Sequence, residues 1–215
     1  MPNPIVIAVI VLASILGAAG QTAGTPASSE AESVAKEWEF SFATIGYLVP
    51  HDQSYVSPTF MADREQLHLE ARYNYEAQRT GSLWVGYNLS TGHTLALEFT
   101  PMLGGVVGDT TGIAPGYEMS LKYKRVELLS DGEVVVDIRN HNSSFFYTWD
   151  ELVYTPLDWF HVGLVSQRTR AYQTDLDVQR GFSAGVSYKK ADFTTYVFNA
   201  GWTDPTVVLS LSVKF

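Results

Sequence analysis

The chain contains no cysteine, which excludes a disulfide framework, a thiolate metal site and a cysteine nucleophile. Charge is also scarce, because Asp, Glu, Lys and Arg make up 17 % of the 215 residues, against about 25 % in soluble domains. Positive charge is the rarer sign, since 14 Lys and Arg face 23 Asp and Glu, a net charge of −9. A phosphate-neutralising surface is therefore missing, and nucleic acid is not an expected partner.

Long apolar runs are confined to the start of the chain. The run from Ile5 to Ala18 is shorter than the ~20 residues that a spanning helix needs, and small residues follow it up to Gly20. We expect residues 1–20 to be a signal peptide, although no basic residue precedes the run; a retained anchor is the alternative. The Gly-, Ala-, Ser-, Thr- and Glu-rich residues 21–36 predict a flexible mature N-terminus.

From Glu37 onward, apolar and polar residues alternate. The clearest segment is the last, in which polar residues separate Val207, Leu209, Leu211, Val213 and Phe215. A soluble sandwich would also alternate. The segments are mostly ten or more residues long, however, which is the length that a tilted strand needs to cross a bilayer and exceeds the usual ~5–6 residues of globular strands.

We predict twelve strands, at residues 37–48, 54–63, 66–76, 81–90, 94–104, 114–123, 125–138, 143–155, 159–172, 178–189, 192–201 and 205–215. Every second connection is a tight turn, and those between are mostly longer, as in the stretch from Gly104 to Ile113. An even strand number with this parity is typical of bacterial outer-membrane barrels. The count falls to ten if residues 115–138 form one strand and residues 55–64 a loop.

Aromatic residues, 13 % of the chain, gather at the predicted strand ends. Those near the short turns are Tyr123, Tyr154, Trp159, Phe160, Tyr188, Phe193 and Phe215, and those near the other end are Tyr47, Tyr75, Tyr172 and Trp202. Outer-membrane barrels carry such aromatic girdles at both interfaces, although aromatic residues are enriched in strands of every kind.

On these features the chain resembles the outer-membrane β-barrel proteins of Gram-negative bacteria. The resemblance covers residues 37–215 and implies an all-β fold, a closed antiparallel up-and-down transmembrane barrel with short periplasmic turns and longer external loops. It implies an outer-membrane location, among membrane lipid and lipopolysaccharide. In this family the last strand commonly ends in Phe, so Phe215 is the implied signal for the barrel-assembly machinery. The resemblance is specific for architecture and hardly specific for function.

The expected function is a narrow passive channel for small polar solutes or ions. Twelve strands about 4.8 Å apart and tilted by about 40° give a backbone diameter of roughly 24 Å, of which about 10–12 Å stays free before large side chains intrude. The 104–113 stretch or the mature N-terminus could constrict it. The expected lumen-lining residues are His68, Glu70, Arg72, Trp84, Glu98, Glu118, Lys122, Glu127, Glu151, Lys189 and Lys214. Five acids against four bases predict no strong ionic selectivity, and pairing of these charges in a filled barrel explains them equally well.

Two other functions stay open: a structural or adhesive barrel that acts through its external loops, and an outer-membrane lipid-modifying enzyme. His68 is the mid-strand candidate base, with Glu70 and Arg72 on the same face, but it is expected to point away from lipid. No catalytic spacing is present, so no enzyme activity and no cofactor is expected. An acidic tip, Asp175-Leu176-Asp177, could hold a divalent cation, yet such tips are more often solvated, and no metal is expected. The sequence leaves the oligomeric state open.

Overall fold

Strands make up nearly all of the structure, a computed structural model that describes residues 37–48, 53–171, 175–201 and 205–215. The elements in chain order are β1 (Glu39–Leu48), β2 (Tyr55–Arg64), β3 (Leu67–Tyr73), β4 (Thr80–Tyr87), β5 (Leu89–Thr91), β6 (Leu95–Gly108), β7 (Gly112–Tyr123), β8 (Val126–Asp137), the 3-10 turn η1 (His141–Ser143), β9 (Phe145–Leu157), β10 (Phe160–Ala171), β11 (Asp177–Tyr188), β12 (Ala191–Phe198) and β13 (Thr206–Lys214). The predicted signal peptide 1–20 and N-terminus 21–36 lie outside the described residues. No helix in the described part of the chain is long and apolar enough to cross a membrane.

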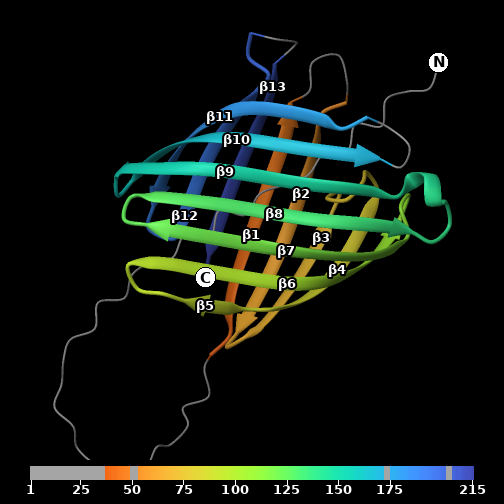
Figure 1. Cartoon of the computed structure of the whole chain (residues 1–215), viewed down its shortest axis with the longest axis horizontal. Coiled ribbons are helices and arrows are strands. Elements are labelled where there is room, and N and C mark those ends of the chain that lie inside the picture. The colour runs from red at the N-terminus through yellow and green to blue at the C-terminus, as the bar shows by residue number, and fades with distance from the viewer. Residues whose placement is uncertain (1–36, 49–52, 172–174, 202–204) are drawn as a thin grey trace, which may run out of the picture.

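The strands form one closed antiparallel sheet (Figure 1). Strand β1 pairs with β13 and so closes the sheet. Both β4 and β5 pair with β6, and because Asn88 alone separates them they form one wall segment. The predicted barrel of twelve wall strands is thereby confirmed. The alternative of ten is wrong, because residues 55–64 are β2 and a turn at Lys124 separates β7 from β8.

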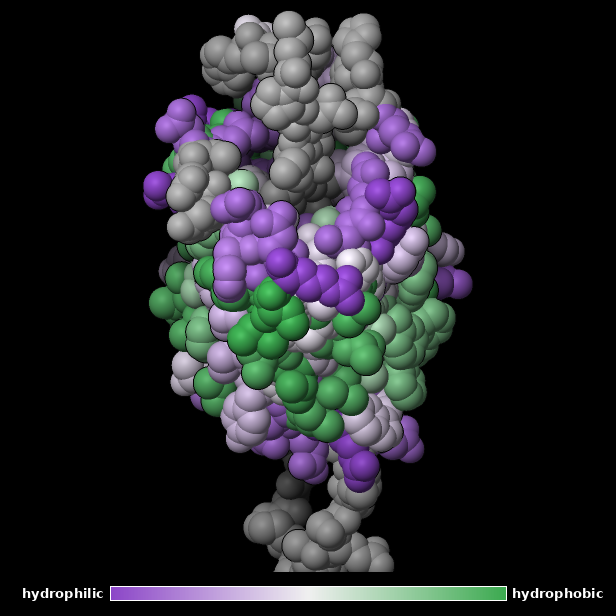
Figure 2. Space-filling model, turned by 90° about the vertical axis from the view of Figure 1, so that its right-hand side faces the viewer, coloured by the Kyte–Doolittle hydropathy of each residue, from purple (hydrophilic) through white to green (hydrophobic). Residues whose placement is uncertain are grey.

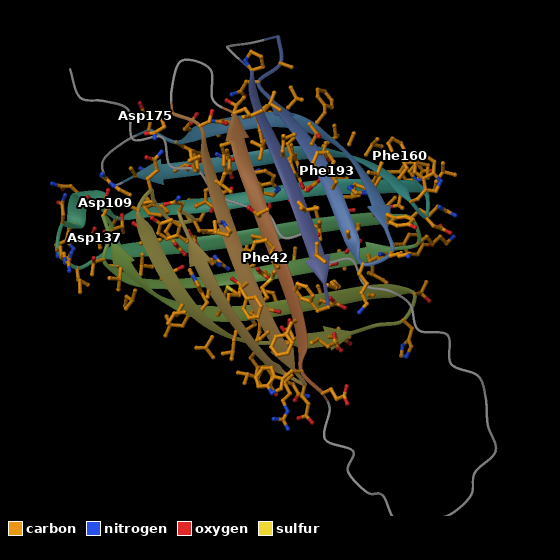
Figure 3. The ribbon with its side chains drawn as sticks, turned by 180° about the vertical axis from the view of Figure 1, so that it is seen from behind. Phe42, Asp109, Asp137, Phe160, Asp175 and Phe193 are labelled. Carbon is orange, nitrogen blue, oxygen red and sulfur yellow. The ribbon has the colours of Figure 1, made fainter. Side chains whose placement is uncertain are left out.

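The connections at one end of the barrel are tight turns. Two residues join β2 to β3, β7 to β8, β9 to β10 and β11 to β12. Three of these turns begin on a residue with positive φ, namely Glu65, Lys124 and Lys189, a conformation that is typical of two-residue hairpins. Asp109, Asp137 and Asp175 lie together at the opposite end (Figure 3).

The 104–113 stretch is not the loop that the sequence predicted. Strand β6 continues to Gly108 and β7 begins at Gly112, so residues 109–111 alone connect them. The glycines of this stretch suggested a turn, but two of them lie at wall positions and pair with β7 in regular register, Gly104 with Ala114 and Gly105 with Ile113. This segment therefore cannot fold into the lumen and constrict it.

Period-two alternation turns large apolar side chains to the outside of the barrel, where Leu83, Phe182 and Leu164 are 71 %, 57 % and 55 % exposed. Figure 2 shows the result as a hydrophobic area across the wall with hydrophilic residues above and below it. A soluble monomer rarely exposes an apolar patch above a few hundred Å². Lipid solvates such a belt, and closure of the sheet satisfies its backbone groups.

The aromatic girdle is found on the outside at the short-turn end. Its members Tyr123, Tyr154, Trp159, Tyr188, Phe193 and Phe215 are exposed, and Phe160 is half-buried. The predicted second girdle is wrong for Tyr47 and Tyr75, which are 4 % and 3 % exposed and belong to the core inside the barrel. Tyr47 follows the inward parity of Ala43 and Ile45 on β1. Tyr172 and Trp202 lie outside the described residues.

Deletion of Phe215 is expected to lower the amount of barrel inserted into the outer membrane. Its backbone N–H donates a 2.9 Å hydrogen bond to the carbonyl oxygen of Phe40, at the end of the β1–β13 seam, and its ring is 68 % exposed. The deletion removes both this bond and the proposed assembly signal. The heat-shifted band of membrane fractions measures insertion, with Phe215→Tyr as the control. Normal insertion of the truncated chain would contradict the assignment of the terminus.

Candidate functional site in the barrel lumen

The inner face of the barrel carries a charged cluster at mid-height. Alternation along β3 turns His68, Glu70 and Arg72 inward, and all three are at most 5 % exposed. On the wall formed by β7 and β8, Glu118 lies opposite Asp131 in register. Since β3 is not a neighbour of β7 or β8 in the sheet, contacts between these groups cross the lumen.

Arg72 connects the two walls. Its guanidinium contacts the carboxylate of Glu70, lies 3.4 Å (Nη1) from Oε2 of Glu133 and lies 3.8 Å (Nη2) from Oε1 of Glu118. The rings of Tyr75 and Trp84 flank the same guanidinium, and their centroids lie 4.1 and 4.4 Å from Arg72 Cζ. Such cation–π contacts are strongest when the cation is desolvated, as it is here.

Glycines on the adjacent strands β6 and β7 make room for the Trp84 ring. A Cβ atom at Gly104 would lie 2.5 Å from the indole, and one at Gly116 would lie 3.1 Å from it. The indole Nε1 donates to Oε1 of Glu76 at 3.0 Å, which fixes the ring over β6 and β7. The glycine-rich sequence of β6 is therefore explained by a tryptophan that packs flat against it.

Little open space is left in the lumen at this cluster. Arg72, Tyr75, Trp84, Glu118, Glu133 and Tyr147, together called the constriction, surround a cavity of about 10 Å³. That volume holds at most about one water molecule. The predicted free width of about 10–12 Å is therefore absent at this level. Wall side chains narrow the lumen here, and Trp84 is one of them.

Aromatic side chains fill further parts of the lumen. Tyr47 stacks on Tyr55 with ring centroids 4.7 Å apart. Trp149 meets Tyr196 and Phe198 edge-on at 5.1 and 5.2 Å. Edge-to-face pairs of this kind add to the stabilisation from burial alone. The described interior thus resembles a packed core around a polar cluster.

The residues predicted to line the lumen do not all meet. His68, Glu70, Arg72, Trp84 and Glu118 meet in the charged cluster, whereas Glu151 lies apart and accepts a 2.6 Å hydrogen bond from Ser183. Lys122 and Glu127 pair at 3.1 Å towards the short-turn end, and Glu98 is half-buried.

Two predicted lysines occupy exposed places at the barrel end. Lys189 lies in the turn after β11, with its ammonium 5.3 Å from the ring centroid of Tyr188, so it is not part of the lumen wall. The predicted strand ended one residue too late at this turn, which assigned Lys189 to the wall. Lys214 is exposed at the end of β13.

The sequence interpretation missed five buried acidic residues, one of which, Asp137, ends β8. Asp131 and Glu133 share the inward parity of Glu127 on β8, so the period-two pattern contains the signal for both. Asp192 likewise has the parity of the inward Thr194 on β12. Glu76 follows β3 in a connection and bends back to Trp84, and no sequence pattern indicates this.

The imidazole of His68 contacts carboxylates rather than a hydroxyl nucleophile. Its Nδ1 lies 2.7 Å from Asp63 and its Nε2 lies 3.0 Å from Glu70. Ligand atoms of His68, Glu70 and Glu118 all lie within 4.8 Å of one another, a spacing that could hold a cation. Because Arg72 contacts the same carboxylate of Glu70, its guanidinium already supplies positive charge at this place.

A second histidine does contact a hydroxyl group. His161 Nε2 lies 3.0 Å from Thr194 Oγ1, which donates to Asp192 Oδ1 at 2.8 Å. The carboxylate therefore contacts the hydroxyl closely, whereas His161 Nδ1 is 3.7 Å from Asp192. In a Ser-His-Asp triad the carboxylate orients the histidine instead. All three residues face the lumen, away from a lipid substrate.

Solved structures share this architecture. A KdgM porin superposes with a TM-score of 0.58 and 10 % identity, over 81 % of this chain and 99 % of its own. The barrel has the KdgM porin fold. A second KdgM porin structure, in complex with disordered oligogalacturonate, matches with a TM-score of 0.55 and 9 % identity, over 82 % of this chain and 98 % of its own. No protein-family model matches the sequence, and no curated protein does.

Proposed function

We propose that the protein is a narrow passive channel of the bacterial outer membrane for small polar solutes, with a preference for neutral and cationic ones. The observation that carries this proposal is the surplus of carboxyl groups around Arg72. Glu70, Glu76, Glu118, Asp131 and Glu133 surround this guanidinium, with His68 beside them. One buried charge removed from water costs several kcal/mol, so hydration, mobile cations or protonation of some carboxyl groups must compensate such a surplus.

Individual oxygen atoms support a wet lumen. Glu76 Oε2 and Glu133 Oε1 are buried and accept no hydrogen bond within the described residues. Buried polar atoms in proteins nearly always have a protein or water partner. Water that enters the constriction from either mouth would supply the missing partners. A column of water through a polar lumen is the minimal path for a small solute.

The sign of the lumen charge selects the solute class. The KdgM porin structure holds an oligogalacturonate, a polymer with a carboxylate on each sugar. Carboxylates of such a ligand would meet the carboxyl groups of this lumen, and like charges in proximity disfavour binding. The fold therefore supports channel activity, whereas the charge of the lumen disfavours an acidic oligosaccharide as the solute.

Reconstituted protein is expected to give discrete openings in planar bilayers and a reversal potential that favours K⁺ over Cl⁻ in a KCl gradient. Glu118→Gln/Glu133→Gln removes two lumen carboxylates and should reduce the cation-to-anion permeability ratio at least about twofold, because fixed charges set the ion concentration in a narrow pore. Glu65→Gln/Asp158→Asn, a pair of exposed carboxylates in two of the short turns, is the charge-matched control and should leave the ratio unchanged. Anion preference in the wild type would contradict the proposal.

A structural or adhesive barrel is the second candidate, favoured by the aromatic filling around Trp149. A correctly folded protein that stays silent in the bilayer would support it. Among the described residues, no contact in the lumen favours a lipid-modifying enzyme. For the channel, membrane lipid, lipopolysaccharide and the barrel-assembly machinery are the proposed surroundings and partners.

A further inference from the structure

Cationic residues on the outer wall of the barrel are concentrated on two adjacent strands. Arg168 and Arg170 on β10 and Arg180 on β11 are exposed and have outward parity, because Val165 and Gln167 between the outward positions of β10 are buried. The outward positions of all other described strands hold one further cation, Arg64, which adjoins the β2–β3 turn. Chance distribution around twelve wall strands does not predict this grouping.

One acidic residue shares the outward face with these arginines. Asp150 Oδ2 on β9 lies 3.6 Å from Arg168 Nη1, and Asp150 Oδ1 accepts a 2.8 Å hydrogen bond from Ser130. Three arginines and one carboxylate leave the patch with a net charge of +2. A second copy docked face to face would bring two such patches together, which like-charge repulsion disfavours. An anionic partner is favoured instead.

The arginines lie at the height of the outer headgroups. Phe160 marks the aromatic girdle, and Arg168 follows it by eight residues along β10. At about 3.3 Å per residue and a tilt of about 40°, this separation is roughly 20 Å along the membrane normal, and Arg170 lies at about 25 Å, the height of the apolar band. Arg180 pairs with Ser166, which lies nearer to the girdle than Arg168 does. From this height a long arginine side chain can still extend to the membrane interface.

Apolar side chains cover the wall below the arginines. Leu152, Leu164 and Phe182 lie on β9, β10 and β11, and they are 46 %, 55 % and 57 % exposed. Leu164 pairs with both of the others in register. The surface is thus cationic at the top and apolar beneath, which matches an amphiphile with a phosphorylated head and several acyl chains.

We propose that the outer face of β9 to β11 binds one phosphorylated lipid of the outer leaflet. Arg168, Arg170 and Arg180 hold its phosphate, and the acyl chains lie on Leu152, Leu164 and Phe182. Guanidinium groups bind phosphate through paired, charge-assisted hydrogen bonds. The inference rests on the proposed membrane location and is independent of whether the lumen conducts.

Native mass spectrometry of the folded barrel in detergent with bisphosphorylated lipid A tests the site. Wild type is expected to retain one lipid, and Arg170→Gln/Arg180→Gln to bind it at least about tenfold more weakly, a loss of about 1.4 kcal/mol. Arg168 stays in place so that Asp150 keeps its partner. Arg79→Gln/Arg139→Gln removes the same charge from exposed connections at the same end and should bind like wild type. Heat-modifiable migration confirms that each variant is folded.

Lipid A without phosphates is expected to bind the wild type as weakly as bisphosphorylated lipid A binds the double variant. The site would be overturned if the double variant bound bisphosphorylated lipid A as tightly as wild type, or if the control variant lost as much affinity as the double variant. Undiminished binding of the phosphate-free lipid to wild type would overturn it as well. Protein dimers in place of lipid adducts would assign the patch to a second copy and also overturn it. A folded barrel that binds lipid A but is electrically silent would overturn the channel and support the lipid site.

Discussion

Tyr75→Ala/Trp84→Ala is expected to increase the single-channel conductance about threefold or more, because the narrowest part of a roughly 24 Å barrel dominates its resistance. The two rings enclose Arg72 and border a cavity of about 10 Å³. Their removal frees the space that the indole occupies over Gly104 and Gly116. Planar-bilayer recording in concentrated KCl measures the increase.

The matched control removes the same two residue types from the outside of the barrel. Tyr123 and Trp159 lie in the girdle at the short-turn end and are 47 % and 57 % exposed. Tyr123→Ala/Trp159→Ala should leave the conductance of inserted channels unchanged. Unaltered conductance in the folded lumen variant would show that resistance lies elsewhere, at the aromatic filling around Trp149, and would contradict the role of the constriction.

The wall of the barrel could be predicted because lipid imposes one rule on every strand. Each outward position meets the same apolar solvent, so Leu83, Leu164 and Phe182 repeat one local pattern without any knowledge of their neighbours. Hairpins then follow from short polar turns, and an even strand number follows from the parity of the connections. This reasoning predicted twelve strands, the turn end and the girdle that surrounds it.

The lumen could not be predicted in the same way, because its inward positions meet no uniform solvent. Tyr147 and Trp149 point inward next to the outward Phe146, so the local sequence is apolar on both faces and the period is lost. Arg72 contacts Glu133, which is 61 residues away in the sequence, and the contact exists only because the sheet closes. Periodicity assigns a residue to a face, whereas contacts across the lumen depend on the size and shear of the barrel.

Arg72→Met is expected to lower the free energy of unfolding by about 3–5 kcal/mol, because it leaves buried carboxylates without their countercharge. Arg72 is 3 % exposed at its side chain, and the Glu70 side chain that it contacts is fully buried. Glu70→Gln/Glu133→Gln in the same chain should restore at least half of the loss, because it removes two of the stranded charges. Equilibrium urea unfolding in lipid vesicles measures all three proteins.

Arg79→Met is the control, since the Arg79–Asp109 pair is also in close contact, at 2.6 Å, but its side chains are 79 % and 51 % exposed. An exposed ion pair contributes about 0–1 kcal/mol, so this variant should unfold close to wild type. Equal stability of the two variants would mean that water solvates the carboxylates around Arg72 as well as it solvates an external connection. The constriction would then be open to solvent in the membrane, and Arg72 would act on the permeating ion rather than on the fold.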